Sequence, residues 1–272
     1  HGLSQTGATV FIEPSEIIEL NNELSLLLNE EKKEIYKILK NLTHEVGVEA
    51  QEFLRTVDIV AHIDSVHAKA KYALEFGGIK PNITDENALI LNNVRHPLLV
   101  HSKGMKKVIP MSIEFSADKR GHLISGPNAG GKTVSLKSVG INIAMALSGI
   151  FPLGDCTTNF RMIYTSIGDH QSIEQDLSTF SSQIIKLKEI LSSANPESLV
   201  LIDEIGSGTD PQEGSALSAG ILDTLIELKS FFVATTHNSV LKSYALSRDV
   251  IRNASLEFDE KKLQPTYKFL EG

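Results

Sequence analysis

The segment His122-Leu-Ile-Ser-Gly-Pro-Asn-Ala-Gly-Gly-Lys-Thr133 is the most informative stretch of this 272-residue chain. Its first four residues are β-prone, and residues 134–147 have the composition of a helix. Between them, residues 126–133 match G-x-x-x-x-G-K-[ST], in which backbone N–H groups of a glycine-rich loop surround phosphate oxygens. The helix N-terminus that follows adds a favourable dipole. Because strand, loop and helix occur in the required order, we predict a phosphate-binding loop.

Side chains at the end of this loop are predicted to hold a nucleotide and a metal ion. Lys132 is expected to reach the β- and γ-phosphates and to act in catalysis, and Thr133 is expected to offer its hydroxyl to Mg²⁺. The predicted nucleotide-binding residues of this segment are Gly126, Pro127, Asn128, Ala129, Gly130, Gly131, Lys132, Thr133 and Val134. The expected ligands are therefore ATP or ADP together with Mg²⁺.

Two further apolar runs end in polar residues that suit the same chemistry. Residues 199–202, Leu-Val-Leu-Ile, are followed at once by Asp203 and Glu204. Ligands bind at the carboxyl ends of strands in parallel sheets, so Asp203 is predicted to bind Mg²⁺ and Glu204 to position or activate the attacking water. Residues 231–236 lead in the same way to His237, which we expect to hydrogen-bond the terminal phosphate or that water in a catalytic role.

The first part of the chain has a helical pattern. Residues 1–13 read as a β-ribbon, with short β-prone runs between glycines. Apolar residues then recur at three- and four-residue intervals, first from Pro14 to Val46 and again from Phe53 to Leu74. These runs predict two long amphipathic helices, and we expect them to pair as a long α-helical hairpin.

The pattern changes after Pro81. Short β-prone runs alternate there with helical segments, which is typical of an α/β domain with a mainly parallel sheet. The candidate strands are Leu89–Leu91, Ile109–Phe115, His122–Ser125, Met162–Ile167, Leu199–Ile202 and Phe231–Thr235. We therefore predict a partial ribbon and helix region over residues 1–80 and a P-loop ATPase domain over residues 81–272, truncated at its C-terminus.

Composition excludes several other classes of protein. The chain has 26 Lys and Arg against 34 Asp and Glu, a net charge of −8, so a uniformly basic nucleic-acid-binding surface is ruled out. Its single cysteine, Cys156, cannot form an internal disulfide, and no apolar run reaches the roughly 18 residues needed to span a bilayer. We expect a cytoplasmic location and no membrane partner. Because the chain opens at His1 without an initiator Met, we also expect it to be part of a longer protein.

Longer motifs connect the chain to a known family. GPNAGGKT at 126–133, GDHQSIEQDLSTFSSQI at 168–184, LVLIDEIGSGTD at 199–210 and TTH at 235–237 together resemble the MutS family of ABC-type ATPases. The opening residues 1–24, HGLSQTGATVFIEPSEIIELNNEL, are more similar to the second bacterial branch of that family, the recombination-suppressing paralogues, than to the mismatch-repair proteins.

This resemblance implies additional nucleotide contacts. ATPase domains of the family dimerise, and Ser178 matches the S-T-F segment that completes the nucleotide site of the opposite subunit. A plain helix N-cap is the alternative role for Ser178. Asn128 matches an asparagine that reaches towards the γ-phosphate. His96 lies in the R-H-P motif that precedes the segment lining the adenine pocket, where Val108 and Ile109 are the expected apolar contacts.

The resemblance also implies a function for the longer protein. ATP binding and hydrolysis would open and close a homodimer and, through the helices of residues 14–80, move a clamp that embraces DNA. In the second branch this activity acts on branched DNA to suppress homologous recombination, and a ribosome-rescue role is implied as well. That branch carries a C-terminal nuclease domain of the Smr type, so we expect no nuclease activity from this chain.

Other functions are open at this point. A transporter cassette or a chromosome-structuring ATPase of the ABC type would share the phosphate loop, but their L-S-G-G-Q signature is missing and S-T-F-S stands at 178–181. A non-hydrolysing, nucleotide-dependent scaffold would use the long helices as its active surface. Asp203 and Glu204 argue against the scaffold, and a phosphate-release assay would distinguish it from an ATPase.

Overall fold

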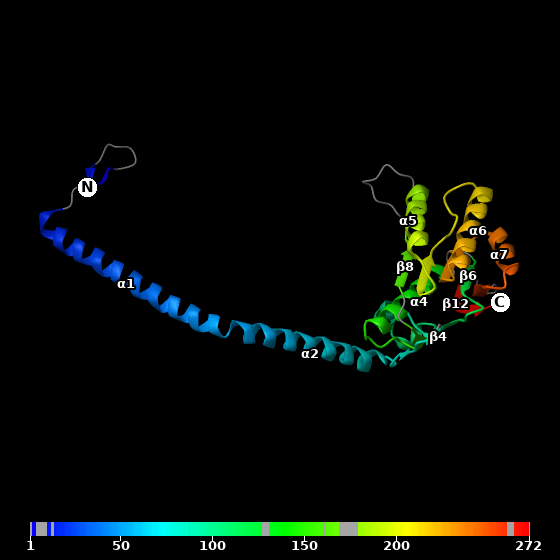
Figure 1. The fold of residues 1–272 in the computed structure, drawn as a ribbon, viewed down its shortest axis with the longest axis horizontal. Coiled ribbons are helices and arrows are strands. Elements are labelled where there is room, and N and C mark those ends of the chain that lie inside the picture. Colours follow the sequence, from blue (N-terminus) through cyan, green and yellow to red (C-terminus); the bar gives the residue numbers. More distant parts are fainter. Residues whose placement is uncertain are drawn as a thin grey trace. The chain divides into compact units, whose positions relative to one another are not determined.

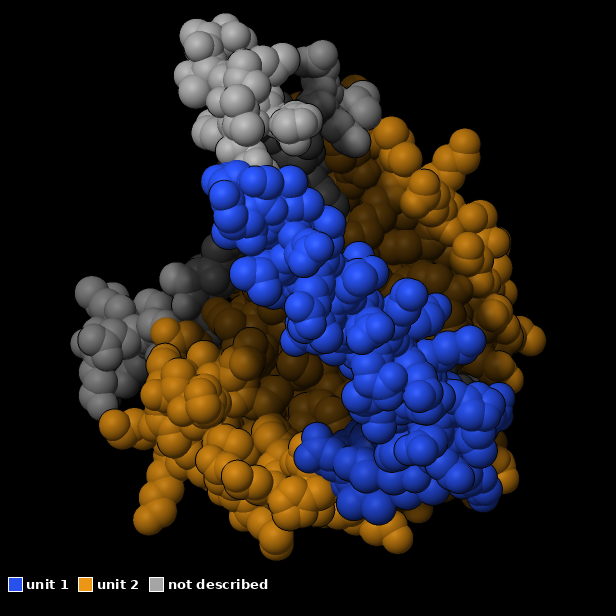
Figure 2. Space-filling view, turned by 90° about the vertical axis from the view of Figure 1, so that its left-hand side faces the viewer, with its two compact units in different colours: residues 1–66 blue, residues 67–272 orange. Residues whose placement is uncertain are grey.

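The computed structural model describes residues 2–3, 10–11, 14–86, 88–126, 131–159, 162–168, 179–259 and 264–271. Figure 1 shows its helices and strands. By their internal contacts the residues divide into two units, residues 1–66 and residues 67–272, which Figure 2 colours separately. The first unit is built from helices, whereas the second contains two larger β-sheets with helices around them.

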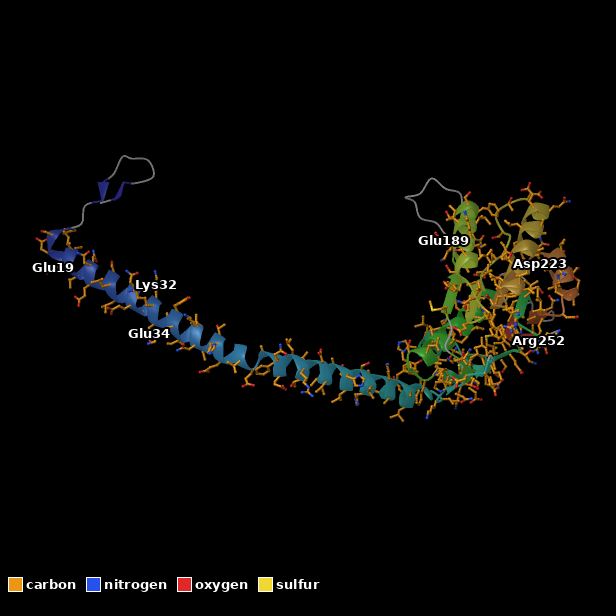
Figure 3. The ribbon with its side chains drawn as sticks, in the orientation of Figure 1. Glu19, Lys32, Glu34, Glu189, Asp223 and Arg252 are labelled. Carbon is orange, nitrogen blue, oxygen red and sulfur yellow. The ribbon has the colours of Figure 1, made fainter. Side chains whose placement is uncertain are left out.

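Helices dominate the first unit. Strands β1 (Gly2–Leu3) and β2 (Val10–Phe11) pair antiparallel, which confirms the β-ribbon predicted there. Helix α1 (Ser15–Val48) begins directly after Pro14, whose ring holds φ at −62°. Helix α2 (Ala50–Phe76) continues into the second unit. The exposed side chains of Glu19, Lys32 and Glu34 project outward from α1 (Figure 3).

The connection between α1 and α2 contradicts the expected hairpin. A single residue, Glu49, separates Val48 from Ala50, and its N–H donates to the carbonyl oxygen of Gly47. Two antiparallel helices need a connecting loop of about two to five residues, so the chain has no room to reverse here. Neither helix buries any residue, which also excludes the close pairing of a hairpin. The hairpin prediction is wrong because the spacing of apolar residues predicts where helices occur. It does not predict whether the connection between two helices reverses the direction of the chain.

A six-stranded sheet forms the centre of the second unit. Its strands are β6 (Gly121–Ser125), β8 (Met162–Ser166), β9 (Ser198–Ile202), β10 (Phe231–Thr236), β11 (Ile251–Asp259) and β12 (Gln264–Glu271). They are arranged in the order β12-β11-β6-β10-β9-β8. Every neighbouring pair is parallel except β11 with β12. The mainly parallel sheet predicted from the sequence is therefore present, with one antiparallel strand at its edge.

A second, four-stranded sheet was not predicted. It has the order β3-β7-β4-β5 and is mostly antiparallel. Its strands are β3 (Asn82–Ile83), β4 (Leu89–Val94), β5 (Met111–Phe115) and β7 (Asp155–Thr158). Between β4 and β5 lie helix α3 (Pro97–Lys103) and the 3₁₀ turn η1 (Met105–Lys107). The strand predicted to begin at Ile109 begins only at Met111, after Pro110, which has no N–H to donate to a neighbouring strand.

Alternate residues of the central strands face opposite layers of the core, as the period of two in a strand requires. On β10, Phe231 and Val233 pack with α4 (Lys132–Leu147) and the four-stranded sheet. Phe232 and Ala234 pack on the other face with α5 (Thr179–Ser193), α6 (Pro211–Glu227) and α7 (Ser239–Leu246). Helices therefore cover both faces of the sheet, and the residues that follow the strands lie at its edge. No helix among the described residues is both long and apolar enough to cross a membrane.

Candidate functional site

Three neighbouring strands bring the predicted site residues together. Strand β10 lies between β6 and β9, and all three run in the same direction. Thr236 pairs with Ser125 and Ala234 with Ile202, so the strands end at nearly the same level. Gly126 after β6, Asp203 after β9 and His237 after β10 therefore share one edge of the sheet. This is the edge where ligands bind in open α/β folds.

Lys132 is the first residue of α4, and its side chain is buried at this edge of the sheet. Gly131 precedes it with a φ of +94°, a left-handed conformation that glycine adopts without strain. The Lys132 Nζ donates to the carbonyl oxygen of Gly126 and, at 3.3 Å, to that of Thr236. Burial lowers the pKa of the lysine, while the carboxylates of Glu204 and Asp203 act in the opposite direction. A buried ammonium group at a helix N-terminus is suited to bind an anion.

Thr133 and Asp203 form the second part of the site. The Thr133 Oγ1 donates to Asp203 Oδ2 over 2.7 Å, although the two residues lie 70 positions apart in the sequence. A hydroxyl and a carboxylate are hard oxygen ligands, and Mg²⁺ typically takes one or two such protein ligands with phosphate oxygens and water completing its shell. The donor set therefore fits the Mg²⁺ predicted from the sequence.

Glu204 has an unusual backbone conformation. Its φ is +50°, which is uncommon for a residue with a side chain. The backbone on both sides is held in place: the Asp203 N–H donates to the Ser166 carbonyl oxygen at 2.8 Å, and the Ile205 N–H donates to the Thr235 carbonyl oxygen at 2.9 Å. The half-buried Glu204 is thus placed beside Asp203 by the ends of β8 and β10. Strained residues of this kind are concentrated at functional sites.

His237 lies where the sequence predicts it. It directly follows β10, its side chain is exposed, and Asn238 behind it caps α7 by accepting the N–H of Val240 at 2.9 Å. The histidine can therefore meet a ligand that approaches this edge. Its role as a phosphate sensor stays a prediction.

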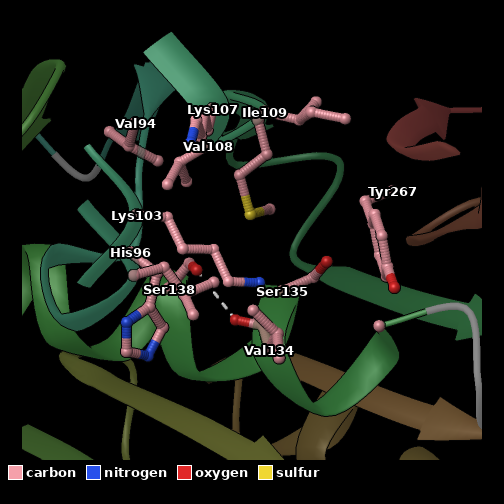
Figure 4. Close-up of a pocket in the computed structure, with 13 residues that line it drawn as sticks. Val94, His96, Lys103, Lys107, Val108, Ile109, Val134, Ser135, Ser138 and Tyr267 are labelled. Atoms are coloured by element: carbon pink, nitrogen blue, oxygen red, sulfur yellow. Dashed lines mark hydrogen bonds between the residues drawn. The ribbon is translucent and has the colours of Figure 1, made fainter. Parts of the chain in front are cut away.

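A cavity of about 250 Å³ opens beside the start of α4. The residues that line it are Val94, His96, Leu99, Lys103, Lys107, Val108, Ile109, Met111, Gly131, Val134, Ser135, Ser138 and Tyr267. Figure 4 shows Val108 and Ile109 across the cavity from Val134 and Ser135. The residues expected to contact adenine, His96, Val108 and Ile109, thus share one cavity with the end of the glycine-rich loop. Mostly apolar walls with a few polar groups are typical of small-molecule sites.

Tyr267 belongs to this cavity but was not predicted from the sequence. It lies on β12, where the pairing with β11 is irregular, and its φ is +59°. A Cβ on Gly131 would come within 2.9 Å of the Tyr267 ring, so the ring lies against the loop. Bulges are known to re-aim side chains next to active sites. Only the pairing of β12 in the sheet reveals this residue, since a lone Tyr in a C-terminal strand carries no motif.

Arg95 stabilises the wall of the cavity that His96 lines. Arg95 Nε donates to the Val108 carbonyl oxygen at 3.1 Å, which joins the segments before and after α3. Burial lowers the pKa of His96, and the charge of Lys137 lowers it further, so the imidazole is neutral near pH 7.

Several predicted residues lie outside the described part of the chain. These are Pro127, Asn128, Ala129, Gly130 and Ser178. The residues that follow Ser178 are described from Thr179 onward. Helix α5 begins at Thr179, and one turn later Gln183 Nε2 donates to the Asp203 carbonyl oxygen at 3.2 Å. The first turn of α5 is therefore hydrogen-bonded to the residue that follows β9.

Comparison with known proteins shows the family to which the chain belongs. A family model described as MutS domain V matches residues 122–271, and the chain belongs to the MutS family. It is 47% identical over 275 residues to a protein named Endonuclease MutS2 from Geobacillus sp. (strain WCH70), which covers 100% of this chain and 35% of the relative. The protein of the same name from Thermotoga maritima is 44% identical over 278 residues, which covers 100% of this chain and 36% of that relative. The chain thus spans about a third of the length of these curated relatives.

Proposed function

We propose that this MutS-family chain is the ATPase part of a larger machine and hydrolyses ATP with the help of Mg²⁺. The single observation that carries this proposal is the Thr133–Asp203 hydrogen bond of 2.7 Å, which joins the end of a glycine-rich loop to a carboxylate at the end of β9. Lys132 directly precedes Thr133 in the sequence, and Glu204 directly follows Asp203. These residue types in one place are what phosphoryl transfer needs, because catalysis there is mostly positioning and charge stabilisation.

Each residue has a distinct role in the proposed reaction. Lys132 binds the β- and γ-phosphates, with the backbone of residues 126–131 around them. Thr133 and Asp203 hold Mg²⁺, which neutralises charge on the phosphates when it is bound. Glu204 positions the attacking water and accepts its proton, and His237 donates a hydrogen bond to the γ-phosphate. The backbone of Glu204 has a φ of +50°, and its N–H and that of Ile205 are hydrogen-bonded. These bonds fix the backbone from which the carboxylate of Glu204 extends.

The cavity beside α4 is proposed to hold the adenine base. Val108 and Ile109 would contact one side of the base, and the exposed ring of Tyr267 would lie against its edge or face. His96 lines the same cavity and begins the segment that leads to Val108 and Ile109. Gly131 and Val134 line the cavity, so a base placed there would lie beside the end of the glycine-rich loop.

The longer protein is proposed to use this reaction to change the state of a dimer. Ser178 of one subunit would complete the nucleotide site of the other, and ATP would thereby open and close the homodimer. Through the helices of residues 1–80, the ATPase domain of residues 81–272 would move a clamp on branched DNA and so suppress homologous recombination, with a ribosome-rescue role as a further activity. The name of the relatives includes endonuclease, and we assign that activity to parts of those proteins beyond the matched region. The proposed setting is cytoplasmic.

A non-hydrolysing, nucleotide-dependent scaffold is the second candidate, favoured by one observation. Helices α1 and α2 bury none of their residues and so offer a long surface for a partner. A chromosome-structuring ATPase of the ABC type would hydrolyse ATP at the same residues.

Two variants test the proposed hydrolysis. Lys132→Ala is expected to abolish nucleotide binding, because Lys132 is the one charged residue in the sequence of segment 126–133. Glu204→Gln is expected to keep ATP bound but to lower turnover by about 100-fold or more, the range for loss of a general base. Nucleotide binding by fluorescence and release of inorganic phosphate are the measurements.

The matched control is Glu189→Gln on the exposed side of α5, away from the site residues. It should hydrolyse ATP at the wild-type rate. Wild-type phosphate release by both site variants would contradict the assignment, and nucleotide binding without any phosphate release by the wild type would favour the scaffold.

A further inference from the structure

We infer that Thr235 is a positioning residue, whose hydroxyl holds the metal-binding carboxylate of Asp203 and the backbone of Glu204 in one arrangement. This inference rests on the proposed function and deepens it. Neither the phosphate-loop motif nor the two adjacent carboxylates points to this side chain. The structure shows it through contacts between the ends of β10 and β9.

The Thr235 hydroxyl uses both of its hydrogen-bonding capacities on the site. Its Oγ1 donates to Asp203 Oδ1 over 2.6 Å and accepts the N–H of Glu204 over 2.8 Å. A hydroxyl has one proton to donate, so that proton is committed to the carboxylate. The side chain is completely buried, where no water competes for these bonds.

The two oxygens of Asp203 are held by hydroxyls from different elements. Thr235 on β10 holds Oδ1, and Thr133 on α4 holds Oδ2 at 2.7 Å. A carboxylate with partners on both oxygens has a defined plane and cannot rotate about its last bond. If Asp203 and Thr133 both bound Mg²⁺, the Thr235 hydrogen bond to Oδ1 would be the contact that keeps this carboxylate oriented. Positioning groups of this kind around metal ligands strongly affect metal affinity and activity.

The same residue holds Glu204 at its unfavourable φ of +50°. The hydroxyl accepts the Glu204 N–H, and the Thr235 carbonyl oxygen accepts the next N–H, that of Ile205, at 2.9 Å. Two consecutive N–H groups are therefore bound by one residue of β10. The direction of the Glu204 side chain, and so the place of the water that it activates, follows from this pair of bonds.

Thr235→Val tests the inference, because valine has nearly the same shape and lacks the hydroxyl. We expect ATP binding without Mg²⁺ to stay within about threefold of wild type. Turnover should fall by about 10- to 100-fold, since a hydrogen bond to a charged group is lost, and half-maximal activity should need more Mg²⁺. Thr235→Ser keeps the hydroxyl and should restore turnover and the Mg²⁺ requirement to near the wild-type values.

Thr158→Val is the matched control. Thr158 is also a completely buried threonine in a strand, and its hydroxyl donates to the Asn159 carbonyl oxygen at 2.9 Å, in the second sheet and away from the site residues. It should turn over like the wild type with an unchanged Mg²⁺ requirement. If Thr235→Val is not folded, Thr235→Ala compared with Thr235→Ser gives the same contrast, because both lack the methyl group and only serine has the hydroxyl.

The outcomes separate this inference from the proposed function. Turnover and Mg²⁺ dependence of Thr235→Val equal to wild type, or equal losses in the valine and serine variants, would overturn the positioning role. So would equal turnover of the alanine and serine variants. If the wild type hydrolyses ATP and Glu204→Gln does not, the proposed function stands even when Thr235 proves dispensable. If Lys132→Ala and Glu204→Gln both hydrolyse ATP at the wild-type rate, the proposed function itself has failed.

Discussion

The helices of residues 15–66 and the central strands of the second unit are both rich in apolar residues, yet they differ completely in burial. Leu20, Leu27 and Val57 on the helices are 55–63% exposed, whereas Val200 and Phe232 on β9 and β10 are fully buried. The helical residues recur at intervals that favour an amphipathic helix, but the structure has no partner for that face among the described residues. Apolar periodicity therefore predicts local structure, and burial depends on a second surface.

This difference separates where substitutions should matter from where they should not. The second unit carries its own core on both faces of the sheet, so changes there should alter stability or nucleotide binding. Changes on the exposed face of α1 should alter neither in the 272-residue chain. The following four predictions test that contrast.

Gly206→Ala is expected to have the largest effect. Gly206 has a φ of +77°, and a Cβ there would collide with Ser218 Oγ and come within 2.6 Å of the Gly214 carbonyl oxygen on α6. The left-handed backbone and the overpacking together should lower the free energy of unfolding by about 2–5 kcal/mol. Urea unfolding measures this.

Gly220→Ala on the same helix α6 is the control for that substitution. Nothing lies within 4 Å of its Cβ position, and alanine in a helix is more favourable than glycine. This variant should be more stable by up to about 1 kcal/mol. Equal stability of the two alanine variants would show that the loop after Glu204 is not packed against α6 as tightly as we describe.

Tyr267→Ala should have the next effect, on nucleotide binding rather than on stability. Loss of an aromatic ring that contacts a base should weaken ATP binding by about 10-fold. Tyr267→Phe keeps the ring and should bind like the wild type. Fluorescence titration with ATP gives both affinities, and wild-type binding by the alanine variant would remove Tyr267 from the site.

A smaller effect concerns the buried His122 on β6. Burial lowers the pKa of His122, although the hydrogen bond from its Nε2 to Glu271 Oε1 at 2.9 Å opposes the shift. Between this lowered pKa and the ordinary value near 6.5, the unfolded chain binds the proton more readily than the folded chain. Stability should therefore decrease as the pH falls from 7.5 to 5.5.

His122→Gln tests this origin of the pH dependence. Glutamine can still donate to Glu271 but does not titrate in that range. Glu271 itself does not account for the effect, because its pKa is lowered from an ordinary value that already lies below pH 5.5. Urea unfolding at the two pH values should show a flatter dependence for the variant. The same slope in variant and wild type would assign the dependence to other groups.

Leu27→Ser on α1 should have the smallest effect. Because Leu27 is 55% exposed, we expect a change in unfolding free energy within about 0.5 kcal/mol. Leu201→Ala on the buried strand β9 is the contrasting variant and should cost about 2–5 kcal/mol. A loss above about 1 kcal/mol for Leu27→Ser would show that the face of α1 packs against another surface, and the contrast between the two regions would not hold.

Much of the second unit follows from local sequence. All six candidate strands occur, with changed ends such as the late start of β5 at Met111. Asp203 and Glu204 directly follow β9, as the apolar run before them indicates. Strand β7 and the four-stranded sheet were missed, because Asp155–Thr158 is short and polar and is extended only through its pairing with β4. The hairpin failed for a related reason, since the single residue Glu49 between two helical patterns carries no visible turn signal.

The sequence by itself identified the glycine-rich loop motif and the polar residues that follow β9 and β10. The order strand, glycine-rich loop, lysine and helix is a local arrangement, so a short motif is enough to specify it. Tertiary structure alone decided which distant groups meet there. The hydroxyl of Thr235 reaches Asp203 across 32 positions, and Tyr267 reaches Gly131 from the last strand of the chain. These contacts depend on strand order and on the irregular pairing of β12, which arise from packing between elements and leave no periodic pattern in the sequence.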